Sequence, residues 1–415
     1  MAARPGALRL RDQPARGVRR RRRALPVGEA GRQRRRRGQR RHPADRHLPL
    51  GTVTRSGRIW KAAPMDGPPL LVGVLHDYPQ GDGGAAFEWA VRRAFTEVER
   101  SGRLPGPLEL VHETALGLPL PGGSARSVED AFRRLDDAGV LAILGPAISD
   151  NAIVVRPMAD AAGVATLNYS GAEESRSAFG FHFQIGSLED EPSFLAAHLA
   201  ERGLRRVALV HDTSYIGRRM ADFFQDACAA YGLALVARAS APTNAPDVGD
   251  AVGVARSTEP DALVTLGLWD LPHAVTLELD TIGWEVPTTA NSALIYGHAD
   301  PQWARDWEGW TYIDTVSETN PRFVALGDAA AAAGHHVGPG TIGGYDMGRL
   351  LAEGFARAHG VTRDAIAGGL DLVKAIPSAT GRPDTLMGFG RHDRGALKGQ
   401  YLVIRQWRDG RSVAW

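Results

Sequence analysis

The stretch Val140–Gly171, VLAILGPAISDNAIVVRPMADAAGVATLNYSG, decides the fold that this sequence predicts. Its apolar runs at Val140–Gly145 and Val164–Leu167 predict two buried strands. The residues between them predict a helix, and Ser149 or Asp150 can cap its first turn. Two parallel strands joined by a helix end at the same edge of a sheet. We therefore expect the loops that follow the two strands to lie side by side.

Those two loops, 147–151 and 168–171, are short and rich in hydroxyl and amide groups. Open parallel sheets bind their ligands just beyond the carboxyl ends of the strands. The N-terminus of a helix also favours negative charge, because its first N–H groups have no partner within the helix. The sequence therefore predicts a small polar pocket that suits a carboxylate or another anion.

The alternation of strand and helix continues along the rest of the chain and indicates an α/β protein with two Rossmann-like lobes. The helices between the strands show apolar residues at i, i+3, i+4 and i+7, and Pro157 is expected to kink one of them. Further strands are predicted at residues 70–75, 108–112, 181–185, 206–210, 234–239, 262–266, 286–290, 310–315, 387–389 and 401–406.

The chain is expected to cross between the two lobes more than once, which predicts a multi-strand hinge. Lobe one is assigned to residues 65–186 plus 316–388. Lobe two, with the return strands, is assigned to residues 187–315 plus 389–415. The expected linkers lie near residues 185–188, 313–316 and 388–391.

The first 64 residues differ sharply from the rest of the chain. They hold 20 Lys and Arg but only 3 acids, whereas residues 65–415 hold 29 basic and 44 acidic residues. They show no hydrophobic periodicity, so we expect a disordered basic tail that is not part of the native protein. The acidic body argues against a nucleic-acid-binding core.

Several other classes of protein are disfavoured. No apolar run reaches the length of about 18 residues that a membrane helix needs, so no transmembrane segment is predicted. The single cysteine, Cys228, cannot form an internal disulfide. No metal site is expected, because the rings of His335 and His336 cannot both point at one ion from a single helix face.

Two short motifs suggest chemistry that their surroundings do not support. Residues 338–343 match GxGxxG, but no strand precedes them, so we interpret them as a turn between helices and expect no cofactor. Residues 149–151 match the Ser-Asp-Asn box of serine β-lactamases. The three lysines of the chain lie outside the companion motifs of that enzyme class. We therefore expect no catalytic residues and no enzyme.

The order and spacing of the elements resemble the type I periplasmic-binding-protein fold. More closely, the chain resembles the substrate-binding (leucine/isoleucine/valine-binding) proteins of branched-chain amino-acid ABC transporters. The resemblance covers about residues 70–410. It rests on the long stretch quoted first and on LLVGVLHDYPQGDGG, FHFQIGSLEDE, RRVALVHDTSYIGRRMADFFQDACAAYG, PDALVTLGLWD and TIGGYDMGRLLAEGFARA.

The resemblance implies a non-catalytic protein with a small-molecule ligand between its lobes and ABC permease subunits as partners. It implies a location at the cell exterior or in the periplasm, although no secretion signal is evident in the sequence. In that family the loops after the third and fourth strands hold the carboxylate of the ligand, and an aromatic residue of the second lobe closes over it. The ligand-binding residues expected here are Tyr78, Ser149, Asp150, Asn151, Tyr169, Ser170, Gly171, Tyr215, Trp269 and Asn291.

One departure from the family concerns the ammonium group of an amino-acid ligand. The family's amino-acid binders place an acid after the last strand of lobe two, whereas residues 289–292 here are Thr-Ala-Asn-Ser. A buried ammonium without an anion is costly. We therefore expect a small organic acid or amide rather than leucine, isoleucine or valine.

Two functions remain open from the sequence. The first is a solute-binding protein that serves an ABC importer. The alternative is an intracellular ligand sensor on the same fold that regulates a protein partner, and the missing secretion signal favours it.

Overall fold

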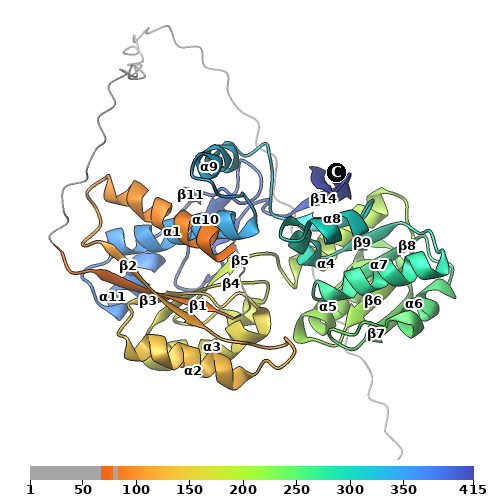
Figure 1. The fold of residues 1–415 in the computed structure, drawn as a ribbon, viewed down its shortest axis with the longest axis horizontal. Helices are drawn as coiled ribbons and strands as arrows, with labels where there is room; N and C mark the ends of the chain where they lie inside the picture. Colours follow the sequence, from red (N-terminus) through yellow and green to blue (C-terminus); the bar gives the residue numbers. More distant parts are fainter. Residues whose placement is uncertain (1–66, 78–82) are drawn as a thin grey trace, which may run out of the picture. The chain divides into compact units, whose positions relative to one another are not determined.

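The computed structural model describes residues 67–77 and 83–415 (Figure 1). The expected basic tail and Tyr78 lie outside the described residues. The described strands form two large sheets and one small one. We call the five-stranded sheet with its helices lobe one, and the seven-stranded sheet with its helices lobe two.

Lobe one is built on a parallel sheet with the strand order β2-β1-β3-β4-β5. Its strands are β1 (Leu70–His76), β2 (Leu108–Thr114), β3 (Ala142–Leu144), β4 (Ala165–Ser170) and β5 (Gly180–Gln184). The strands β1, β3 and β4 are almost entirely buried, as expected for a parallel sheet covered on both faces. The two strands predicted from residues 140–171 therefore form and pair with each other.

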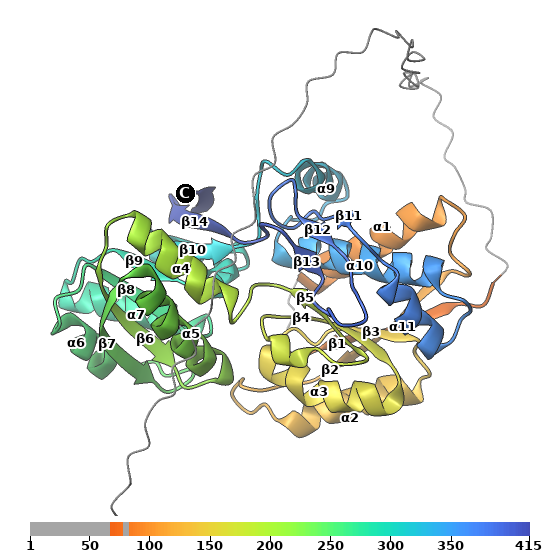
Figure 2. The same ribbon diagram turned by 180° about the vertical axis from the view of Figure 1, so that it is seen from behind.

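Helices cover both faces of this sheet. One face packs against α2 (Ala125–Asp137) and α3 (Ser149–Ala162). The other packs against α1 (Gly83–Glu99), α10 (Pro339–Arg357) and α11 (Arg363–Asp371). Figures 1 and 2 show α10, from the late part of the chain, lying against α1 from its beginning, and the two helices are in extensive contact. The chain thus returns to lobe one after building lobe two.

Lobe two has the strand order β15-β14-β10-β9-β8-β6-β7. The five strands β6, β7, β8, β9 and β10 run parallel. The strands β14 and β15 are antiparallel and lie at one edge of the sheet. The strands are β6 (Arg206–Asp212), β7 (Ala234–Ala241), β8 (Ala262–Leu266), β9 (Thr288–Ala290), β10 (Thr311–Asp314), β14 (Val403–Arg408) and β15 (Arg411–Ala414).

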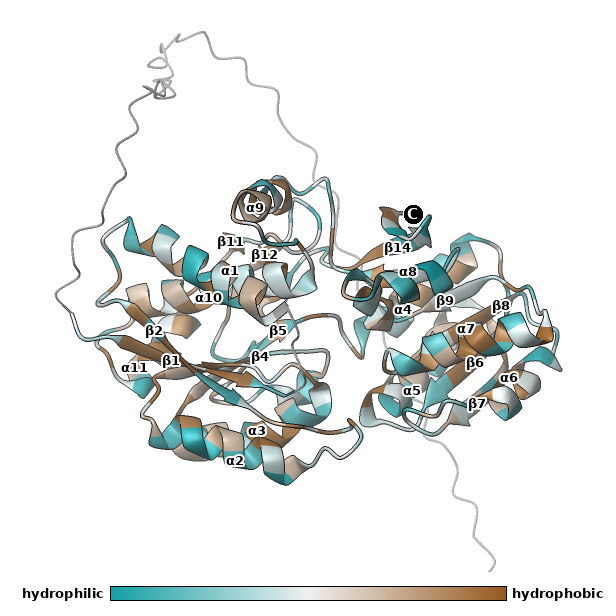
Figure 3. Cartoon of the chain, viewed as in Figure 1, coloured by the Kyte–Doolittle hydropathy of each residue, from teal (hydrophilic) through white to brown (hydrophobic). Residues whose placement is uncertain are grey.

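The helices of lobe two also lie on both faces of its sheet. On one side α4 (Asp190–Glu201) packs with α5 (Tyr215–Tyr231), and on the other lie α6 (Gly249–Arg256), α7 (Asp270–Ile282) and α8 (Pro301–Asp306). The short 3-10 helix η2 (Ser292–His298) follows β9. Figure 3 shows the strands β1 and β6 in the brown of apolar residues, consistent with their burial.

Local signals explain several element boundaries. The Ser214 hydroxyl accepts a hydrogen bond from the N–H of Gly217 and so caps the start of α5, and Gly232 ends that helix in the left-handed conformation. Helix α3 ends in the same way at Gly163. Pro157 lies inside the 14-residue α3, which continues through it, and the expected kink at this residue stays a prediction.

The chain crosses between the lobes three times. It leaves lobe one between β5 and α4, and it returns between β10 and α9 (Pro321–Ala332). The third crossing lies at residues 399–402, later than the expected 388–391. The reason is a small antiparallel sheet of β11 (Ile376–Pro377), β12 (Leu386–Met387) and β13 (Leu397–Lys398), which keeps residues 389–398 with lobe one. Within lobe one, the N–H of His182 in β5 donates to the carbonyl of Arg394 at 2.9 Å and so holds this segment against the five-stranded sheet.

Candidate functional site

The carboxyl ends of the parallel strands in the two lobes contact each other. Glu174, in the 3-10 helix η1 (Glu173–Ser175) after β4, forms an ion pair with Arg219 of α5, with an oxygen–nitrogen distance of 3.2 Å. The side-chain amide of Asn244, after β7, donates to the carbonyl of Pro119 at 3.1 Å. The loops predicted to bind a ligand lie at these same strand ends, so this region is the candidate site.

In lobe one, Asp77 organises the loop after β3. Its carboxylate accepts hydrogen bonds from the N–H groups of Ala147 (2.9 Å) and Ile148 (2.8 Å) and from the amide of Asn151 (2.9 Å). The side chain is fully buried. Burial raises the pKa of Asp77, while these donors act to lower it. A carboxylate of the protein therefore binds the two backbone N–H groups that immediately precede α3.

Asp212 plays the matching part in lobe two. It is the last residue of β6, whereas Asp77 directly follows β1, and its carboxylate accepts from the N–H of Leu268 at 2.7 Å and from the N–H of Ser214 at 2.9 Å. Each aspartate comes directly after a histidine, His76 or His211. This repeated His-Asp pair at the end of the first strand of each lobe is visible in the sequence, and our sequence analysis missed it.

The backbone donors expected to bind a carboxylate are engaged within the protein. The N–H groups of Asn151 and Ala152 both donate to the carbonyl of Ile148, at 3.1 and 3.0 Å. These two N–H groups are therefore paired within the protein, and the binding of a carboxylate at the start of α3 stays a prediction. A helix N-terminus attracts an anion only through donors that remain unpaired.

Several of the predicted side chains also have partners inside lobe one. The amide of Asn151 donates to the carbonyl of Leu118 and accepts from its N–H, in addition to its bond with Asp77. The Ser170 hydroxyl donates to the side-chain oxygen of Asn168 at 2.9 Å, and the Ser149 hydroxyl accepts from the N–H of Gly171 at 3.3 Å. All four of the residues Ser149, Asn151, Ser170 and Gly171 are buried. Their contact with a ligand stays a prediction.

Tyr169 and Asn291 are likewise held by neighbouring backbone. The Tyr169 hydroxyl donates to the carbonyl of Pro339, and its ring lies so close to Gly343 that a side chain there would collide with it. The amide of Asn291 donates to the carbonyl of Gly267 at 2.9 Å and is 3% exposed. Both residues therefore join the candidate site to the loops and helices behind it.

Asp150 differs from its neighbours because one of its carboxylate oxygens is buried without a hydrogen-bond partner in the described residues. Burial raises the pKa of Asp150 to about 6, and repulsion from Asp212 of the other lobe adds to this effect. The guanidinium of Arg218 opposes it. Asp150 is thus a carboxylate that lies between the lobes and lacks a full set of partners.

On the side of lobe two, aromatic rings form a continuous series. Trp269 stacks on Tyr296 with a centroid distance of 5.2 Å and an angle of 12°. Tyr296 contacts Trp303 at 5.2 Å, and Trp303 stacks on His273 at 4.5 Å. We call these four residues the aromatic series. Of them, only Trp269 was predicted, because the others are far from it in the sequence or on a different element.

The second predicted aromatic residue, Tyr215, takes part in the contact between the lobes. Its hydroxyl interacts with the carboxylate of Glu174 and with Arg219. Burial and the negative charge of Glu174 raise the pKa of Tyr215. Burial acts to raise the pKa of Glu174 as well, but the hydrogen bond from Tyr215 and the charge of Arg219 outweigh it and hold that pKa below its usual value.

A carboxylate lies where the family resemblance places an acid, although it comes from a different element. Glu191 of α4 accepts hydrogen bonds from the N–H of Ser292 (2.7 Å), from the Ser292 hydroxyl (2.9 Å) and from the N–H of Ser187 (2.8 Å). It is fully buried, and burial raises its pKa to about 7. Its oxygens are thus used to join the first crossing between the lobes to the end of β9.

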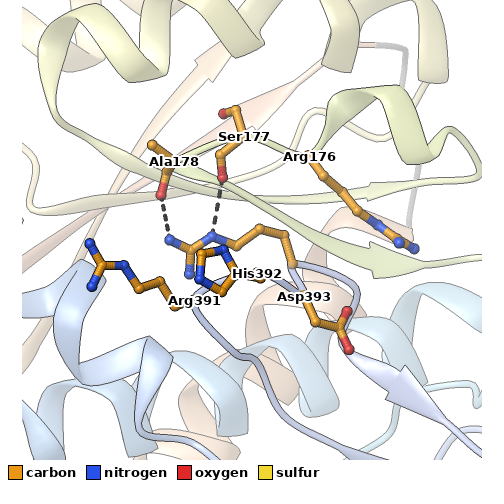
Figure 4. Close-up of a pocket in the computed structure, with 7 residues that line it drawn as sticks. Arg176, Ser177, Ala178, Arg391, His392 and Asp393 are labelled. Carbon is orange, nitrogen blue, oxygen red and sulfur yellow. Dashed lines mark hydrogen bonds between the residues drawn. The ribbon is translucent and has the colours of Figure 1, made fainter.

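A cavity of about 280 Å³ lies elsewhere in lobe one (Figure 4). It is lined by Arg176, Ser177, Ala178 and residues 391–394. The guanidinium of Arg394 donates to the carbonyls of Ser177 (3.1 Å) and Ala178 (2.8 Å), which joins the two walls. None of the predicted ligand-binding residues lines this cavity.

Within the described residues, no group of three His, Cys, Asp or Glu side chains could hold a metal ion. In the same part of the chain, no helix has the length and apolar character needed to cross a bilayer.

A model of the periplasmic binding protein family matches residues 73–410. The chain belongs to the periplasmic binding protein family. Members of this family bind solutes without converting them, so the protein is a binding protein and not an enzyme. A search of curated protein sequences returned no match.

Solved structures share the fold of this periplasmic binding protein. The ABC transporter substrate-binding protein of Desulfitobacterium hafniense has 21% identity and a TM-score of 0.69, over 84% of this chain and 100% of the other. A periplasmic binding protein type 1 from Bordetella pertussis has 18% identity and a TM-score of 0.72 over the same shares. The branched-chain amino acid transporter substrate-binding protein of Streptococcus pneumoniae, solved with isoleucine, has 17% identity and a TM-score of 0.71, over 84% of this chain and 98% of the other. At these identities the likeness concerns the fold alone.

Proposed function

We propose that this periplasmic binding protein captures a small, polar, amino-acid-like organic solute between its two lobes and delivers it to the permease subunits of an ABC importer outside the cytoplasm. Capture involves rotation of the lobes about the three crossings, because short connections of this kind can absorb the changes in backbone angle that closure requires. The protein then changes its shape when it binds and performs no chemistry on the solute.

The contact between the strand ends of the two lobes is the observation that carries this proposal. It combines polar interactions that can break and re-form, Glu174 with Arg219 and Asn244 with Pro119. The half-buried Trp269 and the incompletely paired Asp150 lie at the same strand ends. A permanent interface between lobes would instead bury its apolar side chains and pair its charges.

Two of the similar proteins were solved in complex with leucine and with isoleucine. The N–H groups of Ala147 and Ile148 donate to Asp77, and those of Asn151 and Ala152 donate to the carbonyl of Ile148. We therefore propose that recognition rests on the side chains of lobe two and on the Asp150 carboxylate rather than on these backbone N–H groups.

A thermal-shift screen of small polar solutes, leucine and isoleucine included, tests the function. A ligand present at 100 times its Kd stabilises the folded state by about 2.7 kcal/mol, which raises the melting temperature measurably. Solution scattering with the same ligand should show a smaller radius of gyration. A bound solute that leaves the radius of gyration unchanged would count against capture by closure.

A matched pair of variants shows where the solute binds. Trp269→Ala should abolish the shift or weaken it strongly. Trp415→Ala should leave it intact, because Trp415 is 53% exposed at the end of β15, where it packs on Arg202. Equal loss in both variants would place the site elsewhere.

A further inference from the structure

The cavity of Figure 4 lies beside β5 and is separate from the contact between the lobes. Ser177 and Ala178 of its first wall precede β5, and residues 391–394 of its second wall belong to the connection between β12 and β13. Because the strands of the five-stranded sheet run parallel, the start of β5 and the carboxyl ends of the strands lie at opposite edges. A molecule in this cavity therefore does not occupy the candidate site between the lobes.

The second wall carries two polar side chains that have no partner within the described part of the chain. Gly390 and Asp393 exchange two backbone hydrogen bonds, of 2.8 and 3.1 Å, which close a tight turn with Arg391 and His392 at its centre. Both central residues are exposed, and neither side chain has a hydrogen bond or an ion pair to a described residue. A guanidinium has five N–H donors and is charged at every physiological pH. Arg391 therefore brings a permanent positive charge with free donors to the cavity.

Arg394 fixes the geometry of the cavity. Its guanidinium donates to the carbonyls of Ser177 and Ala178, and Figure 4 shows these two hydrogen bonds as dashed lines between the walls. The same group pairs with Asp371 and lies over the ring of Phe181, 4.3 Å from its centroid. The two walls are thus held at a fixed separation before any ligand binds, which lowers the entropic cost of binding.

The positive charge of the cavity is a local feature. Residues 65–415 hold 29 basic and 44 acidic residues, whereas the seven residues that line the cavity include three arginines and one acid. The acids around the cavity are engaged with other groups: Asp393 with Lys398, Glu173 with Arg176, Asp371 with Arg394, and Asp160 with the Ser177 hydroxyl and the N–H of Phe179. Arg391 has no such partner among the described residues, so its charge remains available to an anion.

The chemistry of the lining favours a small anion with two or more negative charges. The planar fork of a guanidinium matches the oxygens of a carboxylate or a phosphate group. Ligand pockets of about 300–1,000 Å³ take drug-sized molecules, so a cavity of about 280 Å³ fits a smaller one. Arg176 lies on the first wall and Arg391 on the second, so an anion that carries charge at two points contacts both walls.

We propose that this cavity is a second ligand site, which binds a small polyvalent oxyanion such as a tricarboxylate or inorganic phosphate. The guanidinium of Arg391 and the imidazole of His392 donate hydrogen bonds to the anion, and Arg176 supplies positive charge from the other wall. Both walls belong to lobe one, so the anion binds without rotation of the lobes. The site is thereby independent of the proposed capture of a solute between the lobes.

Isothermal titration calorimetry of the full chain with citrate, inorganic phosphate and acetate at one ionic strength tests this site. We expect citrate or phosphate to bind at least about tenfold more tightly than acetate, because acetate carries a single charge and reaches only one wall. The tighter of the two shows whether the site prefers carboxylate or phosphate groups, and added salt should weaken its binding. The proposal is overturned if neither citrate nor phosphate binds, or if acetate binds as tightly as both.

A matched pair of arginine variants locates the bound anion. Arg391→Gln should weaken the binding of the tighter probe about three- to thirtyfold, since a charge-assisted hydrogen bond is lost at a partly exposed site. Arg126→Gln removes the same charge from an exposed residue of α2 that has no ion pair among the described residues, and it should leave the affinity unchanged. Equal affinities of these two variants would contradict the proposal. Both changes are at exposed side chains, so the melting temperature of the ligand-free protein should stay the same.

Solution scattering separates this site from the one between the lobes. Saturation with the tighter probe should leave the radius of gyration unchanged, because both walls lie in one lobe. A contraction that persists in Arg391→Gln would place the anion between the lobes, which overturns this inference and leaves the proposed function standing.

Discussion

At the scale of single residues, two aspartates determine how the strand ends are arranged. Asp77 and Asp212 each end the first strand of a lobe and bind backbone N–H groups of the loop after the neighbouring strand. A carboxylate that accepts several such bonds replaces the water that those N–H groups would lose on burial. Asn151 is held in place by its bond with Asp77, and Ser149 by its bond with the N–H of Gly171. Both contacts are structural and do not depend on a ligand.

Replacing Asp77 by alanine should destabilise the protein strongly. The change leaves the N–H groups of Ala147 and Ile148 buried without an acceptor, and each unsatisfied group costs about 1–3 kcal/mol. We expect a loss of at least about 2 kcal/mol in the free energy of unfolding, measured by urea denaturation. Asp222→Ala is a suitable control, because that side chain is 57% exposed. Equal stability of the two variants would show that Asp77 is not essential to the loop.

At the scale of elements, the first crossing between the lobes is unusually acidic. Residues 187–191 read Ser-Leu-Glu-Asp-Glu, and the Ser187 hydroxyl accepts from the N–H of Asp190 to begin α4. Burial raises the pKa of Glu189 to about 7, with added repulsion from Glu173 and Glu174. Burial has the same effect on Glu191. We therefore expect this connection to respond to pH near neutrality.

The contribution of Glu189 and Glu191 to stability should fall as the pH rises through this range. Both carboxyls have a higher pKa in the folded state than the ordinary value of about 4.3, so the folded protein binds more protons between that value and about 7. Their contribution is fully present below the ordinary value and is lost as the pH rises to about 7. Thermal melts between pH 5 and 8 should show that Glu189→Gln gains stability relative to the parent as the pH rises. A difference between the variant and the parent that does not change with pH would rule out Glu189 as a contributor.

At the scale of the whole molecule, polar contacts between the lobes influence how readily the lobes move relative to each other. The ion pair of Glu174 with Arg219 is partly exposed, with 34% and 38% of the two side chains accessible. Exposed ion pairs contribute only about 0–1 kcal/mol, and salt weakens them. Contacts of this strength can be exchanged for contacts with a ligand.

Arg219→Ala should loosen the ligand-free protein without unfolding it. We expect a larger radius of gyration in solution scattering at low salt, an unchanged melting temperature to within a few degrees, and a smaller difference from the parent at high salt. Arg238→Ala serves as the control, because its ion pair with Asp222 lies within lobe two. An identical radius of gyration in the parent and in Arg219→Ala would mean that this ion pair does not restrain the lobes.

The amino-acid sequence by itself determined the α/β class, the succession of strands and helices along the chain and the two lobes, whereas the position of the binding site at the strand ends stays a prediction. These features depend on local patterns, such as the apolar run before Gly145 and the helical spacing that follows each strand. The family resemblance rested on the same order of elements, and the match over residues 73–410 confirms it.

Only the tertiary structure decided which polar groups are already paired. Asp77 meets Asn151, Asp212 meets Leu268 and Glu191 meets Ser292, over separations of 74, 56 and 101 residues. The aromatic series also joins segments that are distant in the sequence, and so does the small antiparallel sheet of β11, β12 and β13, which places the third crossing at residues 399–402. Hydrogen bonds and ring contacts act over a few ångströms of space, and no periodicity in the chain records which distant residues folding brings within that reach.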